Sequence, residues 1–153
     1  MHLAQINIAC AKTTLDGPEL AGFRAELDRI NAVADACPGF VWRFQDETGH
    51  AMDVRAFDDP RVAINMSVWE TPQALERFVW NTVHVRIYGR RDEWFEQMES
   101  HHMALWWVEE GHVPTPAEGV ARLAHRDAHG ETDHAFGWSH LKETTLWETR
   151  RCA

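Results

Sequence analysis

The stretch Trp69–Trp107 constrains the fold most, because its residue pattern changes from strand-like to helix-like and back within one continuous segment. It holds five of the eight tryptophans, so much of the aromatic core must form around it. Thr71 and Pro72 predict a helix start, since threonine suits a helix cap and proline suits the first turn. We expect this helix to pause at Asn81-Thr82 and a longer helix to run from about Val83 to Glu99, before a strand at Met103–Val108.

Two basic residues fall on the apolar stripe of that longer helix. His84 and Arg91 share the helical spacing of a hydrophobic set made up of Ile87, Tyr88, Phe95 and Met98. We therefore expect both basic side chains to point inward.

Two segments have the alternation of half-buried strands, and each carries polar residues on one side. In Leu3–Ala9, Gln5 and Asn7 share a side with Leu3, and in Arg61–Trp69, Asn65 and Ser67 share a side with Trp69. A third strand is predicted at Phe40–Gln45. Between the strands Leu3–Ala9 and Phe40–Gln45, a helix that ends at Pro38-Gly39 is predicted by Pro18, Glu19 and an apolar stripe.

The remaining segments complete an α+β pattern. Residues 46–60 are expected to form a loop, Thr115-Pro116 starts a helix that ends at Gly130, and Ala135–His140 is expected to be a short strand. The element order β-α-β-β-α-β predicts a ferredoxin-like antiparallel sheet with helices on one face, in a single domain of residues 1–140 followed by a tail at 141–153. An apolar second sheet face would need a partner, so a homodimer is expected.

Composition limits the kind of partner. Fifteen Lys and Arg against 24 Asp and Glu give a net charge of −9, which argues against nucleic acid and anionic membranes and favours a small-molecule ligand. Cys10, Cys37 and Cys152 follow no paired spacing, and the chain has neither a long apolar run nor a signal-peptide pattern. A cytoplasmic protein without disulfides is the expectation.

Several strings, taken in this order, resemble a bacterial family of uncharacterised proteins. They are LAQINIA, LDRINAVAD with PGFVWRFQ, INMSVWET, FVWNTVHVRIYGRRDEWF, LWWVEEGHVPTPAEGVARL and AFGWS. That family is placed in the dimeric α+β-barrel superfamily, near the antibiotic-biosynthesis monooxygenases. The resemblance implies the fold and a homodimer. It does not imply one activity, because relatives include cofactor-free monooxygenases, heme-degrading enzymes, heme-dependent peroxidases, chlorite dismutases and muconolactone isomerases.

A candidate ligand site follows if the polar strand faces meet the second helical unit, where ligands of this superfamily commonly bind. Catalytic candidates are His84, Arg91 and Asn65. Candidate ligand-binding residues are Gln5, Asn7, Arg43, Ser67, Trp69, Tyr88 and Trp106. If the polar faces point to the dimer side instead, this site does not form.

His84 has three interpretations: a neutral core imidazole with a hydrogen-bond partner, a general acid or base, or the axial ligand of a non-covalent heme. Heme is the one cofactor considered, and otherwise none is expected. Arg91 either pairs with Asp92, Glu93 or Glu96 on a solvated surface or binds a ligand carboxylate or heme propionate. Arg43 is a second candidate for the same anion.

Other motifs are weaker. Two pairs of histidines, His101-His102 and His125 with His129, could in principle bind a metal ion. A solvated surface is favoured for both, because no clear carboxylate or cysteine ligand accompanies them in register.

The favoured function is a monooxygenase-like oxidoreductase acting on a hydrophobic or aromatic metabolite, with heme bound at His84 as one version of it. The alternative is a non-catalytic ligand-binding or assembly module of the same fold.

Overall fold

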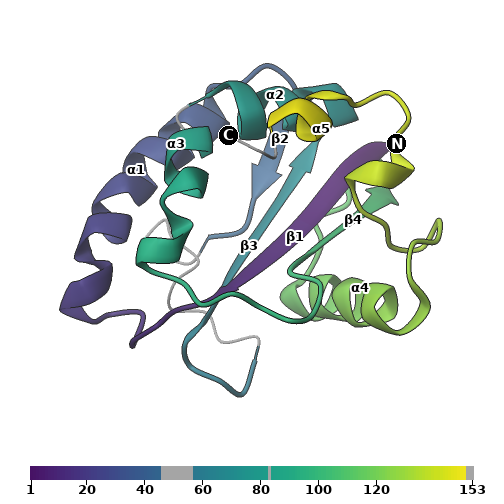
Figure 1. Ribbon diagram of the computed structural model, residues 1–153. Helices are drawn as coiled ribbons and strands as arrows, with labels where there is room; N and C mark the ends of the chain where they lie inside the picture. Colours follow the sequence, from purple (N-terminus) through teal and green to yellow (C-terminus); the bar gives the residue numbers. More distant parts are fainter. Residues whose placement is uncertain (46–56, 83, 151–153) are drawn as a thin grey trace.

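Four antiparallel strands form the centre of the computed structural model, which describes residues 1–45, 57–82 and 84–150 (Figure 1). The strands are β1 His2–Cys10, β2 Phe40–Arg43, β3 Val62–Trp69 and β4 Met103–Val108, in the sheet order β2-β3-β1-β4. This antiparallel sheet, with its helical connections, confirms the predicted ferredoxin-like α+β class. Most of the loop expected at 46–60 lies outside the described residues.

Helices cover both faces of the sheet. On one face, α1 Ala21–Asp35 and α2 Pro72–Asn81 pack on a cluster that includes Leu3, Trp69 and Leu105 of the strands. On the other face, α4 Pro116–His129 packs through Leu123 against Ile6, Met66 and neighbouring strand residues. Figure 1 shows α1, α2 and α3 on one side of the sheet and α4 on the other. The expectation of helices on one face therefore holds for the ferredoxin-like part, whereas the appended α4 lies opposite.

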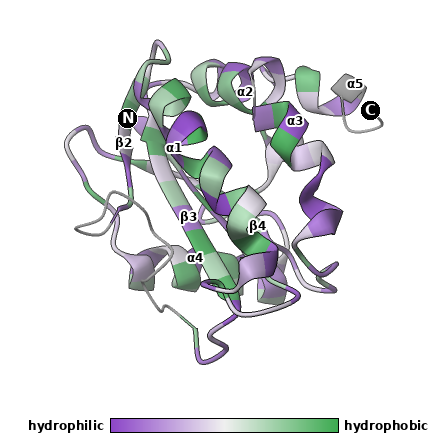
Figure 2. Cartoon of the chain, turned by 90° about the vertical axis from the view of Figure 1, so that its left-hand side faces the viewer, coloured by the Kyte–Doolittle hydropathy of each residue, from purple (hydrophilic) through white to green (hydrophobic). Residues whose placement is uncertain are grey.

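The position of α4 depends on a glycine. A Cβ atom at Gly119 would lie 2.9 Å from Ile6 Cδ1 and 3.0 Å from Met66 Cε, so its absence lets the helix lie close to the sheet. As a result, the chain itself covers part of the face that was expected to meet a second protomer. In Figure 2 the helices carry hydrophobic and hydrophilic residues side by side, as expected for helices with one face on a sheet.

The helix caps of α2 and α4 are as predicted. Thr71 accepts a hydrogen bond from Ala74 N, and Thr115 accepts one from Glu118 N, both at 3.2 Å. At the end of α4, Gly130 has a positive φ of 72° and its amide bonds to Arg126 O.

The prediction of one helix from Val83 to Glu99 is wrong. α3 spans only His84–Gly89, and after it η2, a short 3-10 helix, spans Arg91–Glu93. Beyond this point the backbone pairs with the end of β1: Lys12 N donates to Trp94 O, and Glu96 N donates to Cys10 O at 2.8 Å. Trp94 forms a small core with Ala11 and Leu20, the latter in the 3-10 helix η1 Pro18–Leu20. Backbone pairing with the end of β1 therefore replaces the helix that the apolar spacing predicted for this segment.

The C-terminal part also differs from the expectation. Instead of a strand over Ala135–His140, Phe136 alone pairs with Leu105, and η3 Trp138–His140 is a 3-10 helix. The expected tail packs on the fold: Leu141 joins the core, and Leu146 N of α5 Leu146–Arg150 donates to the buried Glu76 of α2 at 2.6 Å. None of the helices in the described part of the chain is long and apolar enough to cross a membrane.

Candidate functional site

A row of hydrogen-bonded side chains crosses the centre of the sheet on the face covered by α1 and α2. In the register of β1 and β3, Gln5 faces Ser67 and Asn7 faces Asn65, one row beyond the buried pair Leu3 and Trp69. All of these side chains lie on one side, because alternate strand residues share a face. The polar residues therefore face the helices, which is the arrangement that the predicted site required.

Gln5 is the centre of this row. Its Nε2 donates to Asn65 Oδ1 at 2.7 Å and to Ser67 Oγ at 2.9 Å, and Trp69 Nε1 donates to the same Ser67 Oγ at 2.8 Å. Ser67 accepts two bonds, so its hydroxyl proton can be donated to a further group. The amide nitrogen of Asn65 adds a second kind of donor. The row can therefore bind a carbonyl or phenolate oxygen.

Solvent reaches one end of the row. Gln5 and Ser67 are both 7% exposed, whereas Asn65 is exposed and Asn7 and Ala9 are half-buried. The Trp69 cluster borders this strip on one side, and the Trp94 core packs around Ala11 at the end of β1. We call Gln5, Asn7, Asn65 and Ser67 the polar strip.

His84 contacts the aromatic cluster beside the polar strip. Its ring lies 5.1 Å from that of Phe78, and Phe78 in turn stacks on Trp69 at 5.1 Å. His84 Nδ1 lies 3.3 Å from Val79 O, an arrangement that places the proton on Nδ1 and leaves a lone pair on Nε2. Desolvation by burial lowers the pKa of His84, and the Val79 hydrogen bond opposes this only in part. The imidazole is therefore neutral near pH 7.

Arg91 does not point inward. Its side chain is 49% exposed, its guanidinium lies 4.4 Å from the centre of the Tyr88 ring, and it donates to Tyr88 O at 2.9 Å. The physical reason is the end of α3 at Gly89, which removes the helical phase that had placed Arg91 with His84. Tyr88 itself stacks on His84 with ring centres 6.4 Å apart.

The other predicted residues are divided between the two faces. Trp69 is fully buried beside the polar strip. Arg43 is the register partner of Ser67, but it pairs with Asp35 of α1 at 2.9 Å. Trp106 lies on the α4 face, where its Nε1 donates to Glu118 at 2.9 Å, so it is wrong as a residue of this site. The alternation along β4 predicts that Trp106 and Trp107 point to opposite faces of the sheet, but it does not show which of them faces α4.

The histidine pairs do not form metal sites. Within the described ranges, no group of three or more His, Cys, Asp or Glu residues is arranged to hold a metal ion. His125 and His129 lie with ring centres 4.5 Å apart and their ring planes tilted by 39°. His101 Nδ1 instead bonds to Asp127 Oδ1 at 2.8 Å, a pairing across 26 residues that no local sequence signal indicates.

The fold resembles that of a solved oxygenase structure. SnoaB, a cofactor-independent oxygenase from Streptomyces nogalater, is 16% identical with a TM-score of 0.50, over 71% of this chain and 94% of that chain. A mutant of SnoaB gives the same TM-score at 15% identity, over 74% and 98% of the two chains. A putative antibiotic biosynthesis monooxygenase from Chloroflexus aurantiacus J-10-fl is 16% identical with a TM-score of 0.42, over 72% and 98%. At these identities the similarity concerns the fold.

Family membership comes from the sequence as a whole. No protein of curated function matches the chain significantly. A family model does match residues 2–152, which include the helix α4 and the segment that packs on α2. The chain therefore belongs to the family described as a domain of unknown function, DUF3291.

Proposed function

We propose that this protein is a monooxygenase-like enzyme that acts on a hydrophobic or aromatic metabolite at the polar strip. The observation that carries the proposal is the hydrogen-bonded set of Gln5, Asn65 and Ser67, which is buried at one end and open to solvent at the other. Donors at the border of an aromatic cluster suit an aromatic ketone or phenol, because the oxygen can accept the hydrogen bonds while the apolar ring lies toward the cluster.

In this proposal His84 is the proton acceptor. Its free Nε2 and lowered pKa supply a neutral base near pH 7. A substrate methylene group that loses a proton to His84 becomes an electron-rich carbanion, whose enolate oxygen Asn65 and Ser67 stabilise.

Molecular oxygen is the oxidant that accepts the electrons of this carbanion. A carbon–oxygen bond forms, and protonation of the terminal oxygen gives a hydroperoxide on the former methylene carbon. Loss of the remaining hydrogen from that carbon, together with cleavage of the O–O bond, releases water and leaves a carbonyl group. One methylene group and one O2 molecule therefore yield one carbonyl group and one water molecule.

The residues present do not fit the heme alternative that was considered for His84. Propionate binding was one of two alternatives for Arg91, but its guanidinium is engaged with Tyr88 and Asp92 at the surface. His84 alone remains of the proposed heme ligands. We therefore propose chemistry that uses no heme, which agrees with the cofactor independence stated for SnoaB.

Oxygen uptake with anthrone, an enolisable aromatic ketone, tests the proposal. We expect wild-type protein to accelerate uptake above the spontaneous rate. His84→Gln should lower the rate about 100-fold and Asn65→Ala at least about 10-fold, as expected for loss of a general base and of an oxyanion donor. His129→Asn, at an exposed position of α4 on the other face of the sheet, is the control and should retain the rate. Anthrone binding without oxygen uptake would support the non-catalytic module instead.

A further inference from the structure

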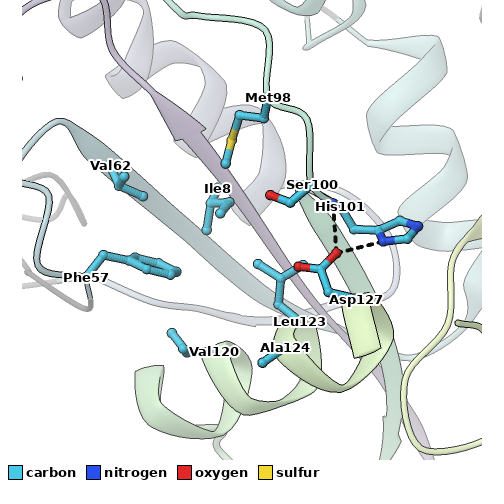
Figure 3. Close-up of a pocket in the computed structure, with 10 residues that line it drawn as sticks. All are labelled: Ile8, Phe57, Val62, Met98, Ser100, His101, Val120, Leu123, Ala124 and Asp127. Atoms are coloured by element: carbon cyan, nitrogen blue, oxygen red, sulfur yellow. Dashed lines mark hydrogen bonds and ion pairs between the residues drawn. The ribbon is translucent and has the colours of Figure 1, made fainter. Parts of the chain in front are cut away.

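A cavity lies on the face of the sheet that α4 covers, away from the polar strip. It has a volume of about 280 Å³ and is bounded by β1, β3, α4 and the segment before β4 (Figure 3). Most of its wall is apolar and is formed by Ile8, Phe57, Val62, Met98, Val120 and Leu123. Since Ile8 alternates with Asn7 along β1, the two sites use opposite sides of the same strand.

One end of this cavity is polar. Ser100, His101 and Asp127 line it, and Figure 3 shows the Asp127 carboxylate joined to His101 by two dashed lines. Both bonds use the same oxygen: Asp127 Oδ1 accepts from His101 N at 2.9 Å and from Nδ1 at 2.8 Å. Asp127 Oδ2 has no hydrogen-bond partner among the described residues, so it can accept one from a ligand.

The charge of this end favours a cation. Neither lysine nor arginine is among the residues that line the cavity, and the whole chain carries a net charge of −9. A ligand carboxylate would meet Asp127 without a compensating cation, whereas an ammonium group would form a charge-assisted hydrogen bond with it.

The volume sets the size of the ligand. It exceeds the roughly 150 Å³ of an apolar cavity that holds benzene and lies near the lower limit of about 300 Å³ for drug-sized ligands. We propose that this cavity is a second binding site, for a small amine with an apolar or aromatic body, whose ammonium group binds Asp127 and whose body packs on Leu123 and Met98. This proposal is independent of the function proposed for the polar strip.

Isothermal titration calorimetry with 2-phenylethylamine tests the proposal, and 3-phenylpropionate serves as the anionic counterpart of similar shape. We expect the amine to bind with a dissociation constant of about 1 mM or lower and the acid to bind at least about 10-fold more weakly. Asp127→Asn keeps the shape of the side chain and removes its charge, and should weaken amine binding about 10-fold.

A matched pair on α4 separates occupation of the cavity from general effects on the helix. Ala124 and Ala121 are both exposed residues of this helix, but only Ala124 lines the cavity. Ala124→Phe should reduce amine binding at least about 10-fold, while Ala121→Phe should keep it within about twofold. Absence of amine binding, equal binding of the acid, or unchanged binding in Ala124→Phe would each overturn the proposal.

Discussion

Gln5 and Ser67 face each other on neighbouring strands, and Gln5 Nε2 donates a hydrogen bond of 2.9 Å to Ser67 Oγ in the buried part of the sheet. Both side chains are 7% exposed, so each polar group depends on the other rather than on water. The same serine oxygen also accepts from Trp69, which links the polar strip to the aromatic cluster under α2.

Replacing this serine should destabilise the fold. Ser67→Ala leaves a proton of Gln5 and the indole N–H of Trp69 without their acceptor, and each buried unpaired donor costs about 1–3 kcal/mol. We expect the free energy of unfolding, measured with urea, to fall by at least about 2 kcal/mol. Ser139→Ala is the control, because Ser139 is exposed and its bond to Glu131 should contribute little. Equal losses in the two variants would contradict the role assigned to Ser67.

His84 should make stability depend on pH. Burial holds its pKa in the folded protein below the ordinary value of 6.5, so unfolding takes up a proton and acid favours the unfolded state. The stabilisation is fully present above about pH 6.5 and is lost as the pH falls below that value toward the folded-state pKa. Between about pH 7.5 and pH 5, His84→Gln should therefore lose less stability than wild type in urea unfolding.

His125 is the internal reference for that measurement. Its pKa is also lowered, mainly by desolvation and then by His129, His134 and Arg122, and it titrates in both proteins. The difference between wild type and His84→Gln thus reports His84. Identical pH profiles would show that His84 is not desolvated.

The turn before β2 should tolerate no side chain. Gly39 has φ 85°, and a Cβ atom there would lie 2.6 Å from Ala74 Cβ of α2. Gly111 has nearly the same φ of 84° but has nothing within 4 Å of such an atom. Gly111→Ala should cost about 1 kcal/mol from backbone strain, and Gly39→Ala should cost at least about 2 kcal/mol more because α2 must also move. Equal thermal unfolding midpoints for the two variants would contradict this account of the contact.

Heme should not bind through His84. When hemin is added, the absorption spectra of wild type and His84→Ala should be the same, because Arg91 is turned to the surface and does not complete a heme site. A Soret band that develops with wild type and is absent with His84→Ala would show that the assignment of His84 as a base without heme is wrong.

Local signals predicted the elements that begin or end at strong caps. Thr71-Pro72, Thr115-Pro116 and Gly130 marked α2 and α4 correctly, because capping involves only residues next to one another. The helix expected to run through Arg91 was wrong because pairing of Trp94 and Glu96 with the end of β1 depends on residues about 85 positions away.

The site was predictable only in part for the same reason. Alternation placed Gln5 with Asn7 and Asn65 with Ser67, but only the strand register shows that these pairs meet and which layer they face. The helical spacing predicted that His84 and Arg91 both point inward. Because the helix ends before Arg91, that side chain lies at the surface. The His101 and Asp127 pair joins a loop to α4, so it became visible only in the folded chain.

Side-chain N–H signals in an NMR titration with anthrone test most directly whether the polar strip binds the substrate. We predict that the Asn65 amide and the Trp69 indole signals shift, since both lie on the face covered by α2, while the indole signal of Trp106 on the α4 face stays in place. Shifts at Trp106 with none at Asn65 and Trp69 would contradict the account.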